Sequence, residues 1–305
     1  MLLQEIGQTG LQGSRLALGC MRMAALDSGQ ARDVLAKAVD LGFNFFDHAD
    51  IYGGGQSEER FAGAMAELGL KREDLILQSK CGIQRGYFDF SKEHIINSVD
   101  GILSRLQTEY LDVLALHRPD ALMVPEEVAE AFAQLKKDGK VRHFGVSNQN
   151  RYQMELLQAY LGEPLAVNQL QLSPAHTPMI DAGLNVNMWG DAGANRDSGI
   201  LEYCQLNKVT VQAWSPFQID LAQGIFANHP DYVQLNETIA KYADQYGVSS
   251  EAITIAWINR HPAKIQTIIG SMNPERLEKI IQAETIELAR PEWYDIYTSA
   301  GNILP

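Results

Sequence analysis

Short apolar runs alternate along this chain with longer segments of helical periodicity, and the alternation repeats without a break in composition. In the helical segments, apolar residues recur at three- and four-residue spacing, as in Val34, Leu35 and Ala38. Such alternation predicts a parallel sheet in which a helix follows each strand. The expected strands are residues 16–19, 43–47, 75–79, 111–116, 141–146, 166–169, 209–214 and 266–269.

Helices are expected between these strands. One of them is expected to begin near Ser57, whose hydroxyl would cap its first turn. Another begins with Pro125 and is followed by Gly139, which matches the usual preference for proline at a helix start and glycine just past its end. The expected helices are residues 28–41, a segment from about 57 onward, 92–106, 125–137, 151–160, 200–206, 232–246, 249–259 and 274–283.

Eight strand–helix units favour closure of the sheet into a barrel, which typically uses about 250 residues as one domain. An open doubly wound sheet is the alternative. It normally carries a glycine-rich turn after its first strand, and none follows residues 16–19. We therefore expect an α/β fold, a single (β/α)8 TIM barrel domain over residues 1–305. Residues 2–12 are expected to form a hairpin across the barrel bottom, and residues 174–198 a long irregular loop.

Charge and cysteine content narrow the possible functions. A formal charge of −13 disfavours nucleic acid and anionic membranes as partners, so the expected partner is a small molecule. Three cysteines without C-x-x-C spacing are typical of reduced thiols in a cytoplasmic protein. The sequence shows no signal peptide, membrane span or metal motif, and it does not predict an oligomeric state. Histidines expected to be structural or at the surface are His94, His143, His176, His229 and His261.

Polar residues end three of the expected strands. Asp47, Lys80 and His117 close successive apolar runs, and Tyr52 lies five residues after Asp47. The carboxyl ends of barrel strands converge on the face that carries chemistry. A free phenol has a pKa of about 10, so Tyr52 is a weak acid unless a cation stabilises its phenolate. Lys80 is expected to supply that cation and Asp47 to hold the lysine. Each residue alone has a structural explanation, as a cap, a solvated strand end or a core histidine, but the combination favours an active site.

Three glycines, Gly53, Gly54 and Gly55, follow Tyr52 between a strand and a helix. That position also suits a phosphate-binding loop, but the G-x-G-x-x-G fingerprint fails because Glu58 occupies the place of its last glycine. The glycines are instead expected to let the backbone turn beside Tyr52.

Several motifs of the chain occur together in one known family: residues 47–53, 79–80, 116–119, 139–148, 168–169, 214–216 and 269–271. From about Arg15 to Ala283, the chain resembles the aldo-keto reductase superfamily. It is most similar to the bacterial oxidoreductases in which His-Ala-Asp-Ile-Tyr-Gly-Gly replaces Asp-Thr-Ala-x-x-Tyr-Gly. The resemblance implies a (β/α)8 barrel that binds NADP(H) without a Rossmann fold.

The resemblance also implies an activity, the NADPH-dependent reduction of aldehyde or ketone carbonyls to alcohols. Tyr52 is the implied proton donor, Lys80 paired with Asp47 lowers the pKa of Tyr52, and His117 orients the carbonyl. The alternative is a regulatory or cofactor-sensing barrel subunit with little turnover. Expected substrate contacts are Met21, Ile51, Cys81 and His117.

Cofactor contacts follow from the same resemblance. Ser147, Asn148 and Gln169 are expected to bind the nicotinamide carboxamide, and the ring of Trp214 to stack on the nicotinamide. Arg276, near the start of a helix, is the one basic residue left to bind the 2′-phosphate, where relatives often have two. The remaining expected contacts are Gly19, Met21, Asp47, Ser215, Pro216, Phe217, Leu221, Gly270, Ser271 and Asn273.

Overall fold

The computed structural model describes residues 1–191 and 193–305 in full, and residue 192 by its backbone alone. Its centre is a closed barrel of eight strands, in which every neighbouring pair is parallel. The predicted (β/α)8 barrel is therefore confirmed. In chain order the strands are β3 (Leu16–Gly19), β4 (Phe45–Asp47), β5 (Ile76–Cys81), β8 (Leu111–Leu116), β9 (Val141–Ser147), β10 (Val167–Gln171), β11 (Thr210–Trp214) and β14 (Gln266–Ile269).

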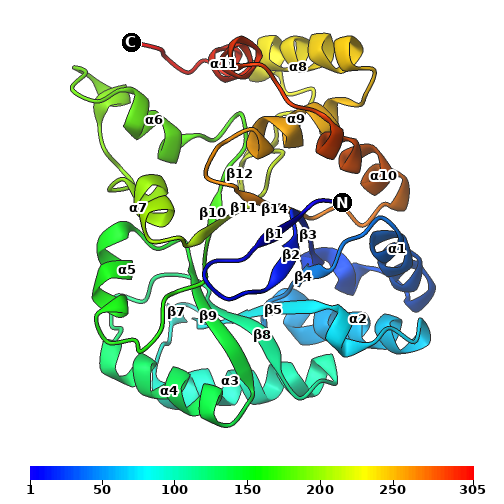
Figure 1. Ribbon diagram of the computed structural model, residues 1–305, viewed down its shortest axis with the longest axis vertical. Helices are drawn as coiled ribbons and strands as arrows, with labels where there is room; N and C mark the ends of the chain where they lie inside the picture. Colours follow the sequence, from blue (N-terminus) through cyan, green and yellow to red (C-terminus); the bar gives the residue numbers. More distant parts are fainter.

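Helices surround the barrel on its outside (Figure 1). Each presents an apolar stripe to the sheet, as α1 does with Val34, Leu35 and Ala38. The helices that alternate with the strands are α1 (Ser28–Asp40), α2 (Gln56–Glu67), α3 (Lys92–Leu106), α4 (Pro125–Lys137), α5 (Arg151–Gln158), α7 (Ile200–Leu206), α8 (Val233–Tyr246), α9 (Ser250–Asn259) and α10 (Pro274–Ile281).

An N-terminal hairpin of β1 (Leu3–Glu5) and β2 (Gln12–Ser14) lies across the barrel, as predicted (Figure 1). Ile6, in the hairpin turn, is fully buried in one apolar cluster with Phe45, Val113 and Ile268 of the barrel strands. Gly7 follows with a left-handed φ of 59°, and a Cβ there would lie 2.6 Å from the carbonyl oxygen of Ala166. The hairpin therefore plugs one end of the barrel with apolar side chains.

Polar side chains replace apolar ones toward the carboxyl ends of the strands. Alternate residues of a strand share a face, so Phe45 and Asp47 point to one side of β4, and Ile76, Gln78 and Lys80 to one side of β5. Phe45 and Ile76 belong to the cluster around the hairpin, whereas Asp47, Gln78 and Lys80 form buried polar contacts with one another. The site thus lies at the end of the barrel opposite the hairpin.

Two sequence expectations were wrong. The side chain of Ser57 does not cap α2, because Gly55 is the N-cap; its buried hydroxyl instead donates to the carbonyl of Met21 at 3.1 Å. The segment 174–198 is not wholly irregular. It contains α6 (Pro178–Leu184), which begins with a proline and buries Met179 and Ile180.

Several elements had no counterpart in the sequence expectations. Helix α11 (Arg290–Ser299) packs against α8. Two short hairpins, β6 (Ile83–Gln84) with β7 (Tyr87–Phe88) and β12 (Gln218–Asp220) with β13 (Gly224–Ile225), extend from the barrel. Among the residues described, no helix combines the length and the apolar character that crossing a bilayer requires.

Candidate active site

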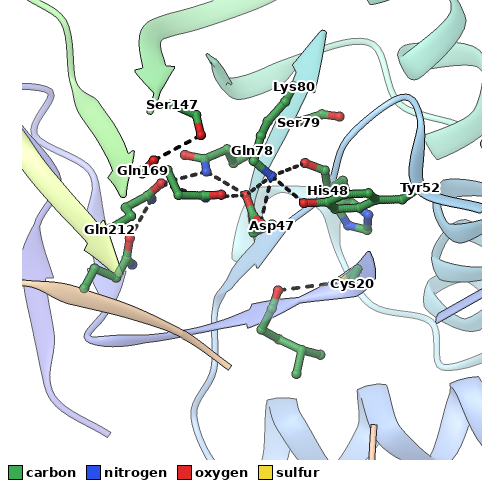
Figure 2. A network of polar contacts seen from close by, with 12 residues as sticks. Cys20, Asp47, His48, Tyr52, Gln78, Ser79, Lys80, Ser147, Gln169 and Gln212 are labelled. Atoms are coloured by element: carbon green, nitrogen blue, oxygen red, sulfur yellow. Dashed lines mark hydrogen bonds and ion pairs between the residues drawn. The ribbon is translucent and has the colours of Figure 1, made fainter. Parts of the chain in front are cut away.

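The ammonium group of Lys80 is the centre of the polar cluster (Figure 2). Its side chain is fully buried at the end of β5. Nζ donates to both carboxylate oxygens of Asp47 at 2.8 Å, to the carbonyl of His48 at 2.7 Å and to the phenol oxygen of Tyr52 at 3.2 Å. The structure therefore brings Asp47, Tyr52 and Lys80 together. It also adds a backbone acceptor, His48, that the sequence did not indicate.

The glycines after Tyr52 form the tight turn that positions the phenol. Gly53, Gly54 and Gly55 all have positive φ, at 59°, 64° and 94°. A Cβ on Gly53 would lie 2.4 Å from the Cβ of Ala24, so the turn packs directly on the segment after β3. The expectation that these glycines serve a backbone turn is confirmed.

For both Tyr52 and Lys80, burial and the charge of the neighbouring group shift the pKa in opposite directions. Burial raises the pKa of Tyr52 above its ordinary value of 10.0, and the nearby Lys80 offsets part of that rise. The expectation that Lys80 brings the phenol below its usual pKa therefore needs correction, because burial outweighs the charge. Burial lowers the pKa of Lys80, but Asp47 and Tyr52 together raise it above the ordinary value. At neutral pH the site thus holds a protonated phenol beside a charged ammonium.

His117 faces the phenol as a neutral ring. Its imidazole meets the ring of Tyr52 edge to face, with centroids 5.9 Å apart. Burial, with Lys80 and Arg118 nearby, lowers the pKa of His117 to about 2. Nδ1 is buried and has no hydrogen-bond partner among the described residues. The ring is partly exposed, so it can meet a ligand through its other nitrogen, Nε2, without carrying a charge.

Two glutamine amides hold the carboxylate of Asp47 (Figure 2): Gln78, to which the sequence assigned no role, and Gln169, which was expected to bind the nicotinamide. Gln78 donates to Asp47 at 2.7 Å, and Gln169 donates to the same oxygen at 3.0 Å. Both also donate to the amide oxygen of Gln212, whose own NH₂ donates to Gln266 at 2.8 Å. A carboxylate only accepts, so it orients the amides that face it. The sequence position of Gln78 could have indicated this role, because Gln78 lies two residues before Lys80, on the same face of the strand.

A second buried carboxylate, Glu58, lies on the other side of β5. It accepts from the hydroxyl of Ser79 at 2.7 Å and from Nε of Arg105 at 2.7 Å. Its burial is complete, and burial raises its pKa despite these donors. In the sequence, Glu58 stands out only as the residue that breaks a phosphate-loop fingerprint. Its contacts instead anchor the start of α2 to β5 and α3.

Asp50 lies near enough to Glu58 and Lys80 for both charges to act on its carboxyl group. Its backbone N–H donates to the carbonyl of Lys80 at 3.0 Å, but its buried Oδ1 has no hydrogen-bond partner among the described residues. Burial first, and the charge of Glu58 second, raise the pKa of Asp50 to about 7. Ionisation of Asp50 therefore opposes folding.

Asp50→Asn is expected to remove a pH-dependent loss of stability. Because the folded pKa exceeds the unfolded value, the wild type loses free energy of unfolding as the pH rises toward about 7. The stability gain of the variant should be roughly 1–3 kcal/mol larger at about pH 8 than at about pH 4, a range reduced for partial exposure. Urea unfolding measures it. Asp244→Asn, at an exposed site, is the control, and equal pH slopes for Asp50→Asn and wild type would contradict the assignment.

The residues expected to bind a nicotinamide lie together at the ends of β9, β10 and β11. Asn148 Nδ2 donates to the hydroxyl of Ser147 at 2.7 Å, and that hydroxyl donates to the carbonyl of Gln169 at 3.0 Å. The indole N–H of Trp214 donates to Asn148 Oδ1 at 3.2 Å. The four residues thus form one hydrogen-bonded group next to Asp47.

The other expected cofactor contacts follow three strand ends. Gly19 ends β3, Ser215 follows β11 with a positive φ of 53°, and Gly270 follows β14. Asn273 caps α10 by accepting from the backbone N–H of Arg276 at 3.1 Å. The exposed or partly exposed members are Met21, Phe217, Leu221, Ser271, Asn273 and Arg276, whereas Pro216 is buried.

A cavity of about 570 Å³ opens beside Trp214 and Asn148. His176, expected to be merely structural or at the surface, lies on its wall together with Arg118. Of the expected substrate contacts, Ile51 lines a separate cavity of about 540 Å³. The Cys81 side chain is fully buried and lines neither of these two cavities. No sequence pattern marks His176 as a site residue, because it lies in the loop after β10, whose path depends on packing.

Comparisons with known proteins identify the family and the fold. The aldo/keto reductase family model matches residues 15–298. An uncharacterized oxidoreductase of Bacillus subtilis, YcsN, is 36% identical over 95% of each chain. The oxidoreductase YdhF of Escherichia coli is 35% identical, covering 97% of this chain and 96% of its own. A 6-dehydroglucose reductase of Agrobacterium fabrum is 30% identical over 95% of each chain.

A solved structure shows the same fold. A thermostable aldo-keto reductase in complex with the inhibitor epalrestat superposes with a TM-score of 0.80 at 26% identity, covering 98% of this chain and 100% of that one. Sequence and architecture agree over nearly the whole length of the barrel. The chain therefore belongs to the aldo/keto reductase family of oxidoreductases.

Proposed function

We propose that this chain reduces aldehyde or ketone carbonyls to alcohols with NADPH as the hydride source. One observation carries the proposal: the buried ammonium of Lys80 donates to the phenol oxygen of Tyr52 at 3.2 Å while Asp47 holds it at 2.8 Å. Because the phenol oxygen accepts this hydrogen bond, the phenol hydrogen remains available for a substrate oxygen. General acid catalysis requires a positioned acid, and a fixed cation beside it stabilises the phenolate that forms.

The residues at the strand ends fit a nicotinamide cofactor. Ser147, Asn148 and Gln169 offer both donors and acceptors, as a bound carboxamide requires. The partly buried ring of Trp214 beside them offers a stacking face. When bound, NADPH supplies the hydride. The start of α10 and the exposed guanidinium of Arg276 would hold its 2′-phosphate.

In this proposal the chain's own residues handle the proton. Tyr52 donates it, because a pKa above the ordinary value keeps the phenol protonated at neutral pH. Lys80 stabilises the phenolate that forms, and Asp47 keeps the ammonium in place. The neutral, partly exposed ring of His117 orients the carbonyl.

The test is turnover with a panel of aldehydes and ketones, followed by the loss of NADPH absorbance. Carbonyl-dependent oxidation of NADPH is expected, and the relative named 6-dehydroglucose reductase supports this direction. Tight NADPH binding without turnover on any carbonyl compound would instead favour a cofactor-sensing subunit. Turnover with NADH but not with NADPH would overturn the cofactor assignment.

Arg276→Ala is expected to weaken NADPH binding selectively. The side chain of Arg276 is 57% exposed, and its one ion pair among the described residues is long, with 3.9 Å between Nε and a carboxylate oxygen of Glu251. Losing a charge-assisted hydrogen bond to phosphate costs roughly 1.5–3 kcal/mol, or about tenfold or more in Kd. Fluorescence titration should show that loss for NADPH and little change for NADH. Arg290→Ala, at another exposed arginine, is the control. Equal losses for both cofactors would show that Arg276 supports the helix instead.

A further inference from the structure

The side chain of Arg118 is partly buried but has no hydrogen-bond or ion-pair partner among the described residues. It follows His117 at the end of β8 and is only partly exposed. Within the described residues, it is the one arginine of intermediate exposure that has neither a hydrogen bond nor an ion pair to its side chain; the others without such partners, Arg85 and Arg290, are exposed. Burial lowers the pKa of Arg118 because the guanidinium has lost part of its water. A cation held partly out of water gains from a charged ligand.

Arg118 lines the cavity of about 570 Å³ beside the active site, so its guanidinium can contact a ligand bound there. Its guanidinium carbon lies 5.5 Å from the centroid of the Trp214 ring, which also lines the cavity. Tyr52 is near enough to raise the pKa of Arg118 against the lowering by burial. A group bound to Arg118 would therefore sit close to the phenol that donates the proton.

The other ionisable residues of the cavity do not neutralise Arg118. The carboxylate of Asp220 accepts two backbone N–H groups of its own turn, at 2.6 and 2.8 Å. Asp197 is partly buried, and burial raises its pKa. Burial lowers the pKa of His176, so that ring is neutral at physiological pH. Arg118 is thus the one permanent cation among the residues lining the cavity, and the two wall carboxylates disfavour a ligand with more than one negative charge.

We propose that Arg118 selects carbonyl substrates that carry a carboxylate, which it binds in this cavity while the carbonyl faces Tyr52 and His117. The inference rests on the proposed reductase function. A guanidinium matches a carboxylate through two parallel hydrogen bonds, which a lysine cannot reproduce. The Trp214 ring behind the guanidinium supports its orientation through a cation–π contact. The substrate class is therefore the oxoacids.

The test compares succinic semialdehyde with its methyl ester, which differs by the loss of the charge. With NADPH in excess, the wild type should show a kcat/KM about tenfold or more higher for the acid. Arg118→Met should reduce this acid-to-ester ratio by about tenfold to a hundredfold, and Arg118→Lys by less. Arg290→Met, an exposed arginine on α11 outside the barrel, should leave the ratio unchanged.

The outcomes separate this inference from the proposed function. If the ester is reduced but the ratio is the same in wild type and Arg118→Met, the inference fails and the reductase stands. Equal losses on both substrates together with a weaker Kd for NADPH would place Arg118 at the cofactor and overturn the inference. If neither aldehyde is reduced, calorimetry with succinate on the NADP⁺-loaded protein decides: saturable binding that Arg118→Met weakens about tenfold supports the carboxylate site, and no binding overturns it.

Discussion

Tyr52→Phe is expected to lower kcat for carbonyl reduction by about 10²–10⁴-fold while leaving the fold and the NADPH affinity in place. The substitution removes one oxygen and keeps the ring that meets His117 edge to face. Among the described residues, that oxygen accepts a single hydrogen bond, from Lys80 at 3.2 Å, and Lys80 keeps its shorter contacts to Asp47 and to the His48 carbonyl. The loss should therefore fall on the chemical step.

Three measurements make this result specific. Steady-state kcat reports the chemical step, a fluorescence titration reports cofactor binding, and thermal unfolding reports the fold. Tyr160→Phe is the matched control, because its phenol is 45% exposed and has no hydrogen-bond partner among the described residues. A Tyr52→Phe enzyme that retains wild-type kcat on an aldehyde would remove Tyr52 from the role of proton donor.

Most of the fold could be predicted because local patterns determine it. The apolar runs became the eight barrel strands, and the bounds predicted for Lys92–Leu106, Pro125–Lys137 and Ile200–Leu206 match α3, α4 and α7. The wrong expectations concern segments whose structure is determined by tertiary packing and not by local sequence. The hydroxyl of Ser57 could cap a helix, but it instead donates a hydrogen bond to the carbonyl of Met21, in the segment after β3. Helix α6 is short and lies within a segment rich in turn residues, so its periodicity gave no signal.

The site was predictable only where a strand end marked it. Asp47 and Lys80 end neighbouring strands of a parallel barrel, and that topology alone brings them together. Contacts across the barrel depend on the stagger of the strands, which the sequence does not state. For that reason Gln212, on β11, could not be assigned to the network around Asp47. The direction of the pKa shift of Tyr52 could not be predicted from the sequence either, because it depends on how far burial outweighs the charge of Lys80.

Lys80→Met is expected to abolish most activity and to destabilise the protein. The methionine fills similar space but leaves the carboxylate of Asp47 buried, with only the amides of Gln78 and Gln169 as donors. Breaking a buried ion pair by removing one partner costs about 3–5 kcal/mol. Loss of the ammonium also removes the charge that lowers the pKa of Tyr52, so that pKa should rise further. Any residual alcohol oxidation, which needs the phenolate, should require a higher pH than in the wild type.

A double-substitution cycle separates the catalytic from the structural effect of Lys80. Asp47→Asn combined with Lys80→Met removes both charges, so the free energy of unfolding should recover by about half or more, while activity stays low because the phenol lacks its cation. Lys241→Met is the control: Lys241 also contacts an aspartate and a phenol, Asp295 at 3.0 Å and Tyr242 at 3.3 Å, but its side chain is 61% exposed. That substitution should cost about 1 kcal/mol or less and leave turnover unchanged. Recovery of activity in the double variant, or an unshifted pH profile for oxidation in Lys80→Met, would show that Lys80 supports the fold without acting on the pKa of Tyr52.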